Sequence, residues 1–142
     1  MRSGSWAAVL PDLLAHIVDQ LGPVVPEHLA LTAAGPQVVL STPKDRPRVV
    51  ATETPGVPAD VDRTGLVAVA AHMLADVQDL VVTHLRAPWP VTGNGQVTHP
   101  MAELVGTSLE MRFATRGDPP DDVIALRAYP VPENPPRVET AG

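Results

Sequence analysis

A histidine and an aspartate one helical turn apart are the side chains in this sequence best placed to do chemistry. His72 and Asp76 lie at i, i+4 within a predicted helix, a spacing that can hold a metal ion or serve as an acid–base pair. The pattern is not H-E-x-x-H, and no second nearby histidine completes a metal triad. We therefore interpret the pair as part of an exposed polar helix face and expect no catalytic residue in it.

Other patterns that could carry chemistry lack the context that the chemistry requires. Asp118, Asp121 and Asp122 cluster in one loop but do not form the D-x-[DN]-x-[DN]-G series of a calcium loop. The glycines of 93–95 neither follow a strand nor open a helix, as a phosphate-binding loop would. The chain has no cysteine, which excludes disulfides, thiolate metal sites and cysteine nucleophiles. These observations predict a protein that is not an enzyme and that holds no cofactor and no metal.

Composition narrows the classes further. The 142 residues include 10 basic and 16 acidic side chains, giving a net charge of −6, which argues against a nucleic-acid partner because phosphate contacts need clustered Lys and Arg. Single Lys, Phe and Tyr residues beside abundant Ala, Val and Pro indicate a high-GC genome, such as that of an actinobacterium or its phage. No signal peptide or run of about 18 apolar residues is evident, so we expect no membrane association. The expected location is the cytoplasm, or a particle assembled there.

The elements that must position any site follow from hydrophobic periodicity. Apolar residues at helical spacing predict a helix over 10–21 and a long helix over 63–86, which Pro88 ends. Short apolar or β-branched runs bounded by Gly and Pro predict the strands, which cover 28–32, 37–41, 48–53, 103–105, 108–115 and 123–131. We predict an α+β fold, with a mostly antiparallel sheet of five to six strands and both helices on one face. Residues 1–131 form one domain in this prediction, and 132–142 form a proline-rich tail.

Trp89, flanked by Pro88 and Pro90, is the most distinctive local feature of the sequence. It could anchor the core or contact a partner, because Trp is enriched both in cores and at interface hot spots. Trp6, before the first helix, could support that helix or face a partner. Together with His99, these residues form the predicted partner-binding set.

The segments Asp76–Val82, Trp89-Pro90 and His99-Pro100-Met101 follow one another over residues 63–113. In this order they resemble a set of uncharacterised actinobacterial proteins with a W-P-x-C-P-x-H-x-H-P-[LM] segment. The Cys and His residues of that set look like zinc-ribbon ligands. In this sequence Thr92 stands where the first Cys would fall, and His99 is the ligand that survives clearly. The resemblance implies a scaffold that has lost its metal site, and it supplies no activity.

Three hypotheses follow from the sequence. The first is a non-enzymatic protein-binding or assembly component, acting through a protein partner or self-assembly, one form of which is a subunit of a phage or phage-like particle. The alternative is a small-ligand or metal-binding domain that uses His99 and neighbouring residues. The third, an enzyme using His72 with Asp76, requires a cleft that holds several titrating groups. The first is the function that the sequence favours.

Overall fold

The computed structural model describes residues 6–42, 48–54, 61–92, 95–116 and 122–131. Within these ranges, two helices and seven strands make up the fold, with short 3₁₀ turns at Trp6–Val9 and Gly22–Val24 on either side of the first helix. The elements are α1 (Leu10–Leu21), β1 (Ala30–Ala34), β2 (Gln37–Thr42), β3 (Arg48–Glu53), α2 (Gly65–Leu85), β4 (His99–Val105), β5 (Ser108–Ala114), β6 (Asp122–Ala125) and β7 (Tyr129–Pro130).

Helix α1 has the predicted bounds. Its apolar stripe is buried throughout, from Leu10 to Leu21. Pro11 occupies the first turn, where its missing N–H costs no helical hydrogen bond. Gly22 ends the helix, and its N–H donates to the carbonyl of Val18.

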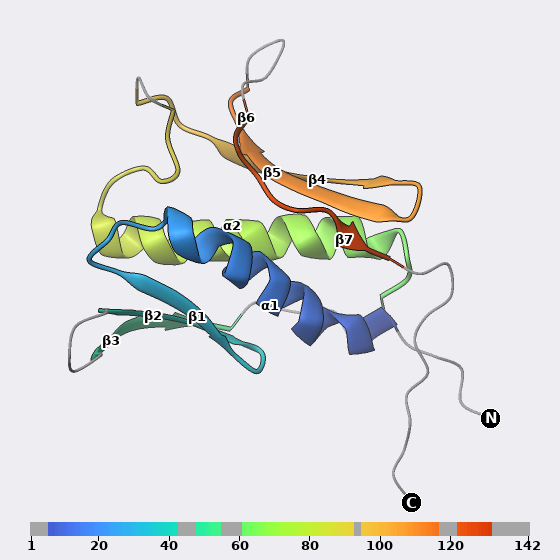
Figure 1. Ribbon diagram of the computed structural model, residues 1–142, viewed down its shortest axis with the longest axis horizontal. Coiled ribbons are helices and arrows are strands. Elements are labelled where there is room, and N and C mark those ends of the chain that lie inside the picture. Colours follow the sequence, from blue (N-terminus) through green and yellow to red (C-terminus); the bar gives the residue numbers. More distant parts are fainter. Residues whose placement is uncertain (1–5, 43–47, 55–60, 93–94, 117–121, 132–142) are drawn as a thin grey trace, which may run out of the picture.

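Helix α2 begins two residues later than predicted. The turn before it is closed by i, i+3 backbone bonds, from the Leu66 N–H to the Arg63 carbonyl and from the Val67 N–H to the Thr64 carbonyl, and not by helical i, i+4 bonds. Asp62 caps this turn, because its Oδ1 accepts from the Gly65 N–H at 2.6 Å and the Thr64 hydroxyl at 3.0 Å. The helix ends where Arg86 adopts the left-handed conformation with φ 56°, and the Arg86 N–H donates to the Val82 carbonyl at 2.7 Å. Its 21 residues span about 32 Å, nearly the length of the molecule (Figure 1).

The α+β class is confirmed, with the strands divided between two smaller antiparallel sheets instead of one sheet. One sheet has the order β1-β2-β3, and the other has the order β4-β5-β6 with β7 also paired to β5. Figure 1 shows the helices between the sheets, so the layers run sheet, helices, sheet. Each sheet turns one face inward, and the largest fully buried side chains include Leu40 from one sheet, Leu13 and Leu74 from the helices, and Met111 and Phe113 from the other sheet. The two helices turn apolar side chains toward both sheets and lie between them. The strands before α2 and the strands after it are therefore kept apart and form two sheets.

The last two sheet elements differ from the predicted ones. The predicted strand over 123–131 is two short strands, β6 and β7, that pair with different parts of β5. Strand β4 starts at His99, four residues before the predicted strand over 103–105, and Pro100 pairs with Phe113 in register. Proline is tolerated there because β4 is an edge strand that need not donate a ladder hydrogen bond on its free side.

Candidate interaction surface

A polar stripe on α1 fastens the C-terminal part of the described chain. Asp12, His16 and Gln20 follow one another at four-residue spacing on one helix face. His16 Nε2 lies 2.7 Å from the Arg127 carbonyl, which can only accept, so Nε2 carries the proton. Gln20 accepts from the Arg127 N–H at 3.1 Å, and the Tyr129 hydroxyl donates to Asp12 Oδ2 at 2.6 Å. This set of contacts, which we call the α1 clasp, joins the first helix to β7.

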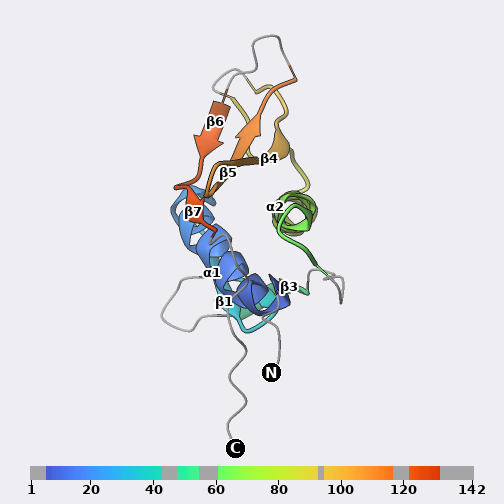
Figure 2. The ribbon, with the colours of Figure 1, turned by 90° about the vertical axis from the view of Figure 1, so that its right-hand side faces the viewer.

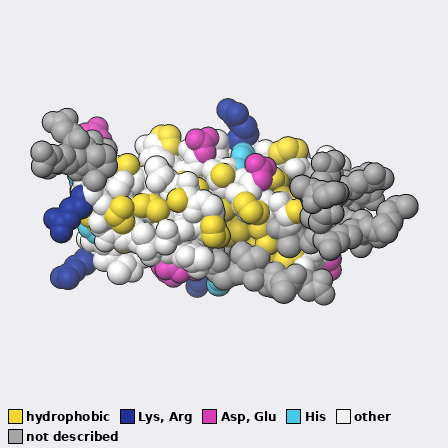
Figure 3. All heavy atoms as spheres, turned by 90° about the horizontal axis from the view of Figure 1, so that it is seen from below, with side chains coloured by type: hydrophobic (Ala, Val, Ile, Leu, Met, Phe, Trp, Pro, Cys, Tyr) yellow, Lys and Arg dark blue, Asp and Glu magenta, His cyan; other side chains and the backbone are white. Residues whose placement is uncertain are grey.

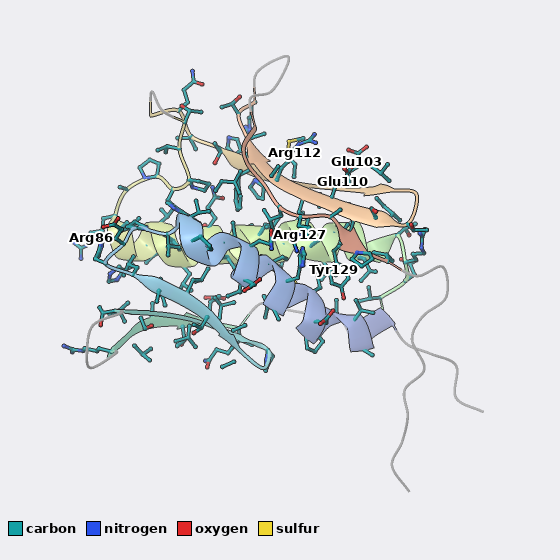
Figure 4. All side chains as sticks on the ribbon, viewed as in Figure 1. Arg86, Glu103, Glu110, Arg112, Arg127 and Tyr129 are labelled. Carbon is teal, nitrogen blue, oxygen red and sulfur yellow. The ribbon has the colours of Figure 1, made fainter. Side chains whose placement is uncertain are left out.

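The pKa of Tyr129 is perturbed in the clasp. Burial of the phenol raises its pKa well above the ordinary value of 10.0, and the hydrogen bond to Asp12 and that carboxylate's charge raise it further. The His16 ring meets the Tyr129 ring edge-on at 5.3 Å between centroids. A tyrosine held protonated and packed in this way is a structural tie that holds β7 against α1. Arg127 and Tyr129 are labelled beside α1 in Figure 4.

The His72–Asp76 pair lies as the sequence predicts on one side of α2. Nε2 and Oδ2 are 3.4 Å apart, and the His72 side chain is 59% exposed. Neither of the two grooves beside α2 that we describe below has His72 or Asp76 in its lining. The geometry is that of an exposed i, i+4 pair on a helix surface.

Helix α2 carries a second, outward stripe that is also apolar. Its inward stripe packs between the sheets, with eight buried residues. On the opposite face Ala68, Ala75 and Val82 follow at seven-residue spacing, with Ala71 beside them, and these side chains are exposed or half-buried. Gln78 and Leu85 continue the same heptad spacing, in which positions 68, 75 and 82 correspond to a and positions 71, 78 and 85 to d. Gln78 donates to the Thr98 carbonyl at 3.0 Å, and Val82 and Leu85 also pack against the core. The outward stripe therefore consists mainly of small alanines, bordered by exposed charged residues.

Two free strand edges border this outward stripe. Strand β3 pairs with β2 alone and β4 pairs with β5 alone, so each presents an unpaired edge within the described chain. Figure 2, which looks along α2, shows the helix at the margin of the molecule with β4 above it and β3 below. We call the outward stripe and these two edges together the α2 face. Free edges of this kind are templates for pairing with another chain.

A groove lies on each side of the C-terminal half of α2. The groove toward β3 has a volume of about 580 Å³ and is lined by residues 50–53 and by α2 side chains that include Asp79, Thr83 and Arg86. The groove toward β4 has a volume of about 450 Å³ and is lined by residues 97–99 and again by Asp79 and Arg86. Asp79 and Arg86 therefore stand on the ridge between the two grooves. Figure 4 shows Arg86 at the C-terminal end of α2.

The structure distributes the predicted partner-binding residues unequally. Trp89 is 7% exposed, with its ring 6.2 Å from that of Phe113 and its Nε1 donating to the Val24 carbonyl at 3.4 Å, so it is the core anchor of the two interpretations. Pro90 is buried with it, whereas Pro88 is exposed. His99 is half-buried at the start of β4, where it lines the groove beside α2. The side chain of Trp6 lies outside the described residues.

The segment that resembles a metal-binding hairpin is closed here by hydrogen bonds. Thr92 Oγ1 accepts from the Gln96 N–H at 2.8 Å, and backbone bonds join the same two residues and Gly95. Thr98 is fully buried and donates to the Pro90 carbonyl at 2.6 Å. Within the part of the chain that the structure describes, no three His, Asp or Glu side chains are grouped to hold a metal ion. The metal-binding alternative therefore gains no donor set from these residues.

The outer faces of the two sheets differ from the α2 face in chemistry. Figure 3 shows the outer face of the β1–β3 sheet, where apolar and uncharged side chains occupy the middle and charged ones lie toward the edges. Thr32, Gln37, Ser41 and Thr52 contribute polar groups to it, so this face can remain in water. On the other sheet Glu103 and Glu110 lie directly opposite each other, with Arg112 as their neighbour on the same face (Figure 4). Exposed large apolar side chains also lie on the sheets, at Val49 of β3 and at Met101 and Val105 of β4, where Glu103 stands between the last two.

By length and composition alone, α2 could cross a membrane, and it is the one such helix in the described parts of the chain. Its most apolar window has a mean hydropathy of 1.5, and 44% of that window is buried. Core helices pass the same test. The expected absence of a membrane partner stays a prediction.

Comparison of the chain with known protein families, with curated proteins and with solved structures finds no match. The resemblance of residues 63–113 to the actinobacterial set stays a prediction.

Proposed function

We propose that this chain is a non-enzymatic protein-binding or assembly component that docks through the α2 face. The observation that carries the proposal is the outward apolar seam of Ala68, Ala71, Ala75 and Val82, on a helix whose other face already fills the core. Apolar seams bordered by charged residues are typical of surfaces that another protein covers. A subunit of a phage-like particle is one form of such a component and stays a prediction from the sequence.

The free edges of β3 and β4 support the same proposal. A partner seated on α2 would also reach these edges, where unpaired backbone groups can accept an added strand. The ridge residues Asp79 and Arg86 supply the charged border that fixes the orientation of a partner. The clasped tyrosine and the exposed His72–Asp76 pair provide no convergent acid–base site in the described residues.

Site-specific photo-cross-linking in the native host tests the proposal. A photoreactive amino acid replaces Ala68 in the seam, and the matched control replaces Ala15, an exposed alanine on α1. We expect a covalent protein adduct from position 68 and none from position 15. The absence of an adduct at position 68, with the protein folded and expressed, contradicts docking through the α2 face.

A further inference from the structure

The outward seam of α2 has a symmetry that restricts what can cover it. Ala68 and Val82 are centred on Ala75, so a second α2 laid antiparallel about Ala75 places each Val82 against the small Ala68 of its partner. The alanines at the crossing permit an interaxial distance near the short end of about 8–10 Å. The heptad spacing of the seam is the spacing that such a pair of helices requires.

The charged residues beside the seam have the same centre. His72 and Asp79 occupy equivalent heptad positions next to Ala75. In an antiparallel pair each Asp79 lies opposite the partner copy's residue 72, a histidine. The two-fold axis repeats this aspartate–histidine contact, so the dimer contains two of them. At the ends, each Arg86 lies near the turn that holds the partner copy's Asp62, a carboxylate already fixed at the start of the helix. The midpoints of these charge pairs, 72 with 79 and 62 with 86, fall within about one residue of Ala75. Ala75 is also the midpoint of the apolar pair of Ala68 and Val82.

The parallel arrangement and a lipid surface fit these residues less well. Parallel helices related by two-fold symmetry set Asp79 and the His72 of the partner copy on opposite sides of the seam, so this pairing is lost. A bilayer would place the exposed Asp79 and Arg86 in or beside hydrocarbon. A second antiparallel copy gives both of these groups an opposite partner.

On these grounds we propose that the α2 face binds a second copy of this chain, with α2 antiparallel to α2 about a two-fold axis beside Ala75. The inference rests on the proposed function and names the occupant of the same surface. The axis brings β4 alongside the partner's β4, and β3 alongside the partner's β3.

The expected affinity follows from the size of the surface. The seam from Ala68 to Val82 is about 21 Å long and about 10 Å wide, so it covers roughly 200 Å², against about 800 Å² per partner in a standard interface. The strand edges must supply the remainder, and free edges contribute largely backbone contacts. We therefore expect a dissociation constant on the order of micromolar.

Sedimentation equilibrium of the purified full chain, at concentrations from below to above about 10 μM, tests this inference. The wild type should form a dimer, and Ala75→Glu, which sets two carboxylates beside the axis, should weaken dimerisation by about tenfold or more. Ala15→Glu, the matched change on the exposed face of α1, should leave the dimer unchanged. Circular dichroism confirms that each variant is folded.

A charge exchange tests the antiparallel register itself. His72→Glu should weaken the dimer because a carboxylate at position 72 then faces Asp79, and adding Asp79→Lys should restore it to within about twofold. A dimer that the second change fails to restore overturns the proposed register. A wild type that stays monomeric throughout overturns the second-copy inference. If photo-cross-linking at position 68 then captures a different protein, the proposed function stands, whereas no adduct overturns both.

Discussion

Replacing Tyr129 by Phe removes one hydroxyl and nothing else from the α1 clasp. That hydroxyl donates to Asp12 Oδ2 at 2.6 Å, and Tyr129 is 8% exposed. Hydrogen bonds to charged groups contribute about 1.5–3 kcal/mol to stability, and the Asp12 carboxylate is exposed enough to regain water when the hydroxyl is lost. We therefore expect the free energy of unfolding to fall by about 1–1.5 kcal/mol at neutral pH, measured by urea denaturation.

The same side chain gives stability a dependence on alkaline pH. The unfolded tyrosine loses its proton near its ordinary pKa of 10.0, whereas burial and the hydrogen bond to Asp12 raise the pKa of the folded one. Above pH 10.0 the folded state binds more protons than the unfolded state. The contribution of Tyr129 to the free energy of unfolding is therefore complete below pH 10.0 and is lost as the pH rises toward the pKa of the folded tyrosine. The slope reaches about 1.4 kcal/mol per pH unit at most.

The chain has a single tyrosine, so tyrosinate absorbance follows Tyr129 alone. We expect the folded protein to resist ionisation at pH values where the urea-unfolded protein ionises. Tyr129→Phe should lose the alkaline fall in stability that this group causes. A folded tyrosine that titrates at its ordinary pKa, or a variant as stable as the wild type, would refute the clasp as a structural tie.

Three further changes test other parts of the fold by urea denaturation. Thr98→Val should cost about 1–3 kcal/mol, because it removes the buried donor to the Pro90 carbonyl; a loss below about 0.5 kcal/mol would contradict that assignment. Arg86→Gly should stabilise the monomer by about 0.5–1 kcal/mol, because Arg86 holds φ 56° at the helix end, and destabilisation would show that its side chain contributes to the fold. Glu103→Lys should stabilise by about 0.2–1 kcal/mol by replacing a like-charged pair with Glu110, with Glu103→Gln as the intermediate case; no gain in either variant would argue against the β4–β5 register.

Local signals in the sequence were sufficient for the helices and for most strands. The stripe from Leu10 to Leu21 and the Gly22 stop define α1 without any tertiary information. Strand pairing could not be predicted in the same way, because a short apolar run does not specify which sheet it joins. The break between β6 and β7 depends on two separate pairings with β5 that no local pattern encodes.

The candidate surface was harder to predict than the fold. Asp12, His16 and Gln20 are typical of an exposed helix face, and the segment that they bind lies more than 100 residues away in the chain. The outward seam of α2 was overlooked because its members at 68, 71 and 75 are alanines, which stand out less in a hydrophobic pattern than the leucines and valines of the buried stripe. The heptad spacing of these alanines was the available signal.

A single cysteine at position 75 tests the central claim most directly. The chain has no cysteine of its own, so Ala75→Cys introduces one thiol beside the proposed two-fold axis, next to the same residue of the partner copy. The account predicts that mild oxidation yields a disulfide-linked dimer, since the Cβ atoms of residues that meet at such an axis can approach the roughly 3.5–4.5 Å that a disulfide requires. Ala15→Cys should stay monomeric under the same conditions. A folded Ala75→Cys protein that forms no more covalent dimer than Ala15→Cys would contradict the pairing of α2 with a second copy of itself.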